Sequence, residues 1–170
     1  MRKILCILLI LALSGNILGC STLSDSNTKE ISFYYVRNII DYDSASPVLT
    51  KTQLIFPQNE GYEEILQEYL RSSATNDYAP PFPKGTELLA LNVENNQAII
   101  TLTHQLFTLS ESRQIIAFAC IAKTVISITG QNDVQIIIAN TDQTAFATYN
   151  FSTDSFTFLD SFTVDDLDKA

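Results

Sequence analysis

The sequence has 170 residues, of which 46% are hydrophobic, and a formal net charge of −9 at pH 7. This length predicts one domain with a sizeable apolar core. Because an acidic chain repels phosphate groups, the charge argues against nucleic-acid binding and against membrane attachment through a basic patch.

The N-terminus has the pattern of a secretory signal. Met1-Arg2-Lys3 is basic, and residues 4–13 form a continuous apolar run. The run is too short for a membrane-spanning helix, which needs roughly 20 residues. It fits the apolar region of a signal peptide, with a buried core helix as the alternative interpretation.

The residues after this run resemble a bacterial lipobox. Ile17-Leu18-Gly19-Cys20 has an aliphatic residue, a tolerant position, a small residue and then cysteine. In such signals the cysteine thiol receives a diacylglycerol and becomes the first residue after cleavage. We therefore predict a lipoprotein signal peptide over residues 1–19, with Cys20 as the lipidation site and palmitate among its acyl chains. An ordinary secretion signal with an incidental cysteine is the alternative.

Residues 20–30 are predicted to be a flexible tether, because Ser21 to Lys29 is polar and lacks aromatic side chains. The chain has 3 cysteines. Cys6 would leave with the signal and Cys20 would be acylated, so Cys120 would have no disulfide partner. The fold must then depend on its apolar core.

Two strands and a helix are predicted first in the mature chain. Residues 31–36 and residues 48–56 alternate between apolar and polar positions, and Pro57 ends the second strand. Residues 62–70 carry apolar side chains at helical spacing, with Asn59 as a candidate N-cap.

A hairpin and a long helix follow. Residues 88–103 predict a β-hairpin whose turn is Glu94 to Gln97, since its two asparagines tolerate left-handed backbone conformations. Residues 113–128 are apolar on more than half of a helix circumference, which predicts the most buried helix. Ser110 is its candidate N-cap, and Gly130 is expected to end it.

The last predicted elements are a strand over residues 133–139 and a second hairpin formed by residues 145–151 and 156–159. Residues 161–170 are expected to form an acidic tail after the domain. The order β-β-α-β-β-α-β-β-β predicts an α+β domain over residues 31–160. We expect one mixed or antiparallel sheet with both helices packed on one face.

Candidate catalytic groups are few. His104 is the one histidine, and no acidic residue lies near it in the sequence to orient it as a triad requires. Cys120 lies among apolar residues of the long helix, whereas a reactive thiol needs an electropositive, partly exposed setting. Both are interpreted as structural, and we predict no catalytic residue.

Acidic residues do not follow metal-ligand spacing. The loop pair Asp41 and Asp43 and the tail residues Asp165, Asp166 and Asp168 lack the glycine and the distal glutamate of a calcium loop. We predict neither a metal nor a cofactor. The other acidic cluster is the expected solvent face of the first helix: Glu60, Glu63, Glu64 and Glu68.

The segment Pro83 to Val93, PKGTELLALNV, resembles the P-x-G-T-x-L entry of the GerM (GerMN) family of sporulation and germination domains. The order of the predicted elements around it is also similar, and the resemblance covers about residues 31–158. This chain departs from many members at Thr101 and Thr103, where they carry an acidic residue and a serine. It also has Ser72-Ser73 where a Gly-Pro is common.

The resemblance implies an extracytoplasmic, non-catalytic domain, often on a lipoprotein. It also implies a likeness to domains that build rings by packing a helix of one copy against a sheet of the next. We therefore expect a lipid-anchored protein-interaction module on the extracytoplasmic face of the cell membrane, linked to sporulation or germination.

The expected partners are the membrane, through lipid on Cys20, and envelope or sporulation proteins, with a second copy of the chain among them. Two alternatives stay open. A small envelope hydrolase would need His104 or paired carboxylates converging in a pocket. A solute-binding lipoprotein would need an apolar cleft of about a few hundred Å3 or more.

Overall fold

The structure is a computed structural model that describes residues 27–38, 47–160 and 163. The predicted signal peptide and the predicted lipidation residue, Cys20, lie outside these residues. Asp41, Asp43 and the acidic cluster of the tail also lie outside them.

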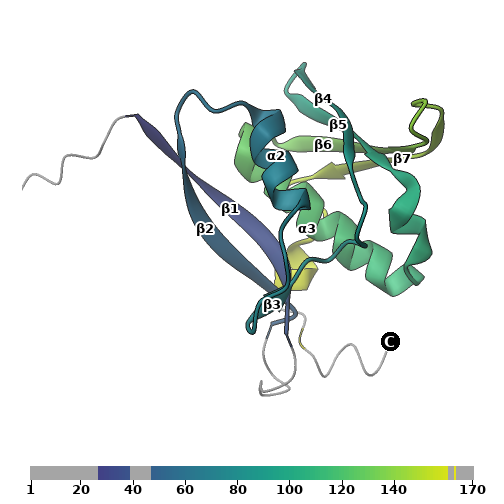
Figure 1. Cartoon of the computed structure of the whole chain (residues 1–170), viewed down its shortest axis with the longest axis horizontal. Coiled ribbons are helices and arrows are strands. Elements are labelled where there is room, and N and C mark those ends of the chain that lie inside the picture. Colours follow the sequence, from purple (N-terminus) through teal and green to yellow (C-terminus); the bar gives the residue numbers. More distant parts are fainter. Residues whose placement is uncertain (1–26, 39–46, 161–162, 164–170) are drawn as a thin grey trace, which may run out of the picture.

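The described chain forms two sheets and two α-helices (Figure 1), which confirms the α+β class. The three-stranded sheet has the order β2-β1-β3, and the four-stranded sheet has the order β4-β5-β6-β7. The elements in chain order are β1 (Thr28–Arg37), β2 (Leu49–Pro57), α2 (Tyr62–Leu70), β3 (Tyr78–Ala79), β4 (Leu88–Glu94), β5 (Gln97–Thr103), α3 (Glu111–Thr129), β6 (Asp133–Ala139) and β7 (Ala145–Ser152). Two 3-10 helices, η2 (His104–Thr108) and η3 (Thr157–Asp160), follow β5 and β7.

Several predicted elements have the expected positions. The turn between β4 and β5 places Asn95 at φ 49° and Asn96 at φ 64°, the left-handed conformations that asparagine tolerates. Helix α3 begins after Ser110 and ends at Gly130, whose φ of 70° favours glycine. The N-cap of α2 is Gly61, not Asn59, and it makes no side-chain cap hydrogen bond. β1 begins at Thr28, so the last residues of the predicted tether belong to the strand.

The predicted strand over residues 156–159 is wrong. This segment is largely η3, and the second hairpin is instead formed by β6 and β7, which pair antiparallel. The side chains of Phe156 and Leu159 are buried, and those between them are exposed. This spacing of three fits a 3-10 helix, in which residues i and i+3 lie on one side.

The sheet count also differs from the single predicted sheet, because α3 takes the position of a neighbouring strand along β1. The backbone N–H of Ser32 donates to Ser127 Oγ at 2.8 Å, and that of Tyr34 donates to Thr124 Oγ1 at 3.0 Å. Thr124 and Ser127 are three residues apart and so share one face of α3. The helix therefore satisfies outward groups of β1 and covers part of that edge.

Helix α3 is also the crossover between β5 and β6, which are parallel. Its length and composition would allow it to span a membrane, but 61% of the apolar 18-residue stretch that would do so is buried inside this domain. The inward side chains of β5 and β6 are fully or almost fully buried: Ala98, Ile100, Leu102, Val134, Ile136 and Ile138. Helix α3 therefore belongs to the core of the domain.

Tyr69 of α2 joins the other helix to β1. Its hydroxyl donates to the Tyr34 carbonyl oxygen at 2.6 Å, and its ring centroid lies 5.1 Å from that of Phe33 and 5.5 Å from that of Tyr35. The ring also lies 5.1 Å from Phe82 in the segment before β4. The buried side chain of Tyr69 thus connects α2, β1 and the segment before β4.

We predict that Tyr69→Phe lowers the free energy of unfolding by about 1–3 kcal/mol, because it leaves the Tyr34 carbonyl without this donor. Chemical denaturation measures the change. Tyr62→Phe on the same helix is the matched control, since Tyr62 is 40% exposed and should change stability little. Equal effects of the two substitutions would contradict the role given to the Tyr69 hydroxyl.

Stability should also fall at alkaline pH. Burial raises the pKa of Tyr35 to about 12 and holds the pKa of Tyr69 well above its usual range. Unfolded tyrosines lose their protons near pH 10, so between about pH 10 and 12 the unfolded chain binds fewer protons and folding weakens. The Tyr35 contribution is present below pH 10 and is about 2–3 kcal/mol. Denaturation at a series of pH values should give a shallower alkaline slope for Tyr35→Phe, and an unchanged slope would refute this prediction.

Candidate interaction site

The sequence candidates for chemistry are not brought together. His104 is an exposed residue at the start of η2, and its ring lies edge-on to Phe146 at 6.2 Å between centroids. Within the described ranges, its side chain has no hydrogen bond or ion pair. Thr103 has a different role from a catalytic hydroxyl, since it accepts from the Glu87 N–H at 2.9 Å and donates to the Gly85 carbonyl at 3.3 Å.

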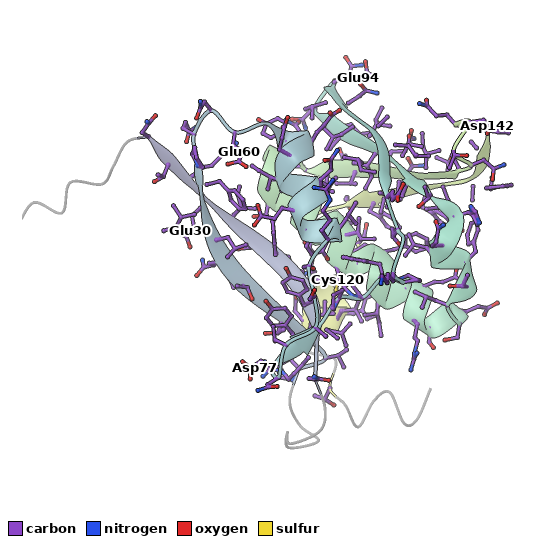
Figure 2. The ribbon with its side chains drawn as sticks, viewed as in Figure 1. Glu30, Glu60, Asp77, Glu94, Cys120 and Asp142 are labelled. Atoms are coloured by element: carbon purple, nitrogen blue, oxygen red, sulfur yellow. The ribbon has the colours of Figure 1, made fainter. Side chains whose placement is uncertain are left out.

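Cys120 lies in the interior of the domain (Figure 2) and is fully buried. Burial raises the pKa of its thiol far above the usual range, which disfavours the thiolate needed for nucleophilic chemistry. Among the residues that the structure describes, no three histidine, cysteine, aspartate or glutamate side chains are grouped to hold a metal ion.

A cleft of about 820 Å3 lies between the end of α2 and the segment Pro80 to Leu88. Its apolar wall comes from both sides: Leu70, Pro80, Phe82, Pro83 and Leu88. Polar side chains complete the lining: Gln67, Arg71, Ser72, Ser73, Lys84, Thr86 and Glu87. The segment that carries the family resemblance therefore begins in the wall of this cleft.

One turn shapes that wall. The Thr86 backbone N–H donates to the Pro83 carbonyl at 3.2 Å, and the Thr86 hydroxyl donates to the same oxygen at 2.9 Å. Gly85, the third residue of the turn, has a φ of 88°, a conformation that side chains with a Cβ rarely adopt. The P-x-G-T pattern thus specifies a tight turn, and Thr103 attaches the turn to β5.

The charge of the cleft differs from that of the chain as a whole. Arg71 and Lys84 line it together with a single acidic side chain, Glu87. Arg71 Nη2 donates to Gln67 Oε1 at 3.5 Å, and neither cation is in an ion pair with another described residue. In a chain of net charge −9, this cleft therefore offers two cations to an anionic group.

Sequence reasoning did not find this cleft. It treated the helix over residues 62–70 and the segment Pro83 to Val93 as separate features, whereas the fold packs α2 against β4 and places the Tyr69 ring 5.1 Å from that of Phe82. Ser72-Ser73 entered the sequence analysis only as a departure from the Gly-Pro common in the family. A basic residue at the end of a helix and another in a proline-rich turn were the available signal, but their proximity depends on tertiary packing.

The comparison with protein-family models agrees with the resemblance. The family model Germane, described as sporulation and spore germination, matches residues 32–144. No curated protein matches the chain. Among solved structures, a 2.5 Å crystal structure of a "Putative Lipoprotein" from Clostridium perfringens is 20% identical, with a TM-score of 0.45 over 75% of this chain and 89% of that chain. The match to residues 32–144 spans β1 to the end of β6, so the chain belongs to the Germane family of sporulation and spore germination.

Proposed function

We propose that this chain is a non-enzymatic, lipid-anchored interaction module on the extracytoplasmic face of the cell membrane, where it acts in sporulation or germination. The observation that carries the proposal is the cleft between α2 and residues 80–88. Its wall includes the turn that distinguishes the family pattern. Its cations are available to a partner, and it is lined by neither His104 nor Cys120.

The anchor in this proposal is a diacylglycerol on Cys20. Residues 21–27 would separate it from β1, which begins at Thr28. An extended chain spans at most about 3.5 Å per residue, so the start of β1 would lie within roughly 25 Å of the bilayer surface. That range favours partners in or on the same membrane.

The cleft fits a short, extended segment of another envelope protein. Pro80, Pro83 and Phe82 supply a wall that loses little conformational freedom on binding. Arg71 and Lys84 favour an acidic side chain or a terminal carboxylate at its rim. The partner in this account is therefore an acidic, partly apolar peptide segment.

A solute-binding role is the second candidate, because the cleft volume of about 820 Å3 falls in the range of ligand pockets, roughly 300–1,000 Å3. The two candidates differ in the size of the bound species. A protein partner is retained when a membrane extract is dialysed, and crosslinking to it gives a product of higher molecular mass. A small solute is lost on dialysis and gives no such product.

The anchor is tested by Cys20→Ala, which should move the full-length chain from the membrane fraction to the soluble fraction. Mass spectrometry of the wild-type N-terminal peptide should show the acyl groups. Cys6→Ala is the matched control and should leave membrane attachment unchanged. A Cys20→Ala chain that still fractionates with the membrane would contradict lipid anchoring.

The cleft is tested by Arg71→Glu and Lys84→Glu in the full-length chain. Each should reduce recovery of a crosslinked envelope partner about tenfold, because it replaces attraction for an acidic segment with repulsion. Arg113→Glu on α3 is the control, since Arg113 is exposed and does not line the cleft. Equal recovery by all three variants would place the partner surface elsewhere.

A further inference from the structure

Strand β2 has an uncovered edge. It is the outer strand of its sheet, and no described element runs along its far side (Figure 1). The backbone N–H groups of Ser32 and Tyr34 donate to α3. The backbone N–H and C=O groups of Phe33, which lies between them, therefore point to β2, where Phe33 pairs with Thr52. Along a strand, the backbone N–H and C=O groups of successive residues point to opposite edges.

The outward N–H and C=O groups of β2 are therefore those of Lys51, Gln53 and Ile55. These groups have no partner among the described residues. On β1, the other strand of this antiparallel pair, the backbone groups that point away from β2 are covered by α3. A long free edge of this kind is a template for another strand.

Side-chain exposure points to the same edge. Ile55 is 74% exposed, a higher fraction than any other exposed large apolar side chain in the described part of the chain. Lys51 and Gln53 are exposed beside it on the same sheet face. Lys51 is the one charged residue of β2.

We propose that β2 pairs antiparallel with β2 of a second copy, about a two-fold axis through Gln53. In this register Gln53 faces its own equivalent, and Lys51 of each copy faces Ile55 of the other. The outward groups of both strands become partners, and the methylenes of each lysine cover the exposed isoleucine. The two three-stranded sheets join into one.

Charge selects this register. Ile55 pairs with Glu30 on β1, so Lys51 of one copy lies two strand spacings from Glu30 of the other. That separation is about 10 Å between Cα atoms, which extended lysine and glutamate side chains span. Figure 2 shows Glu30 beside the β1–β2 ribbon, and both residues are exposed without a described ion-pair partner. An axis through Lys51 would instead place the two lysines opposite each other.

This contact closes with two copies and uses strand edges, unlike the helix-on-sheet contact of ring-building domains. It does not depend on the cleft. Anchoring of both copies in one membrane would raise their effective concentration, and in that respect the inference rests on the proposed function.

The register is tested by oxidative crosslinking of the full-length chain in membranes. In the proposed pair, two Gln53→Cys residues have Cα atoms about 5.5 Å apart, within disulfide range. Two Lys51→Cys residues would be about 14 Å apart and should not join. The wild type controls for the native cysteines. A covalent dimer from Gln53→Cys, at least fivefold above Lys51→Cys and the wild type, is expected; equal yields from the two variants would overturn the proposal.

A charge swap in the Gln53→Cys background provides the second readout. Glu30→Lys alone and Lys51→Glu alone should each reduce the dimer yield several-fold, and the two together should restore it. Unchanged yields, or a double variant no better than the singles, would overturn the register. Loss of membrane attachment in Cys20→Ala would lower every yield together, which separates failure of the anchor from failure of the strand pairing.

Discussion

The arrangement of the domain depends on how the helices satisfy the inner edge of β1. Two hydroxyls of α3 accept backbone N–H groups of this strand, and the Tyr69 hydroxyl of α2 donates to one of its carbonyls. Buried backbone groups must find partners, and here helices supply them in place of a strand. These contacts of the two helices with β1 keep the two sheets separate. They also fix the position of α2, whose end forms one wall of the cleft.

Local patterns in the sequence predicted most individual elements. Alternation predicted β1 and β2, the two asparagines predicted the hairpin turn, and apolar spacing predicted both helices. The sheet arrangement was not predictable in this way, because Thr124 and Ser127 look like ordinary polar positions of an apolar helix. The strand predicted over residues 156–159 was wrong for a related reason. Four residues are too few to distinguish the alternation of a strand from the spacing of a 3-10 helix.

The candidate site was less predictable than the fold. Pro83, Gly85 and Thr86 carry the family resemblance, and the structure shows that they form a tight turn. Their position beside Arg71 follows from the Tyr69–Phe82 contact, which joins segments that sequence analysis treats separately. The cleft and the β2 edge are on different elements, so the proposed partner segment and the proposed strand pairing do not compete for one surface.

The most direct test of the cleft as a partner surface is photocrosslinking from a single position in native membranes. A photoreactive residue at Ser73, an exposed residue of the cleft lining, is compared with one at Thr108, which is exposed and outside it. The account predicts that Ser73 gives one discrete crosslinked envelope protein and that Thr108 does not. The same product from both positions, or none from Ser73, would contradict it.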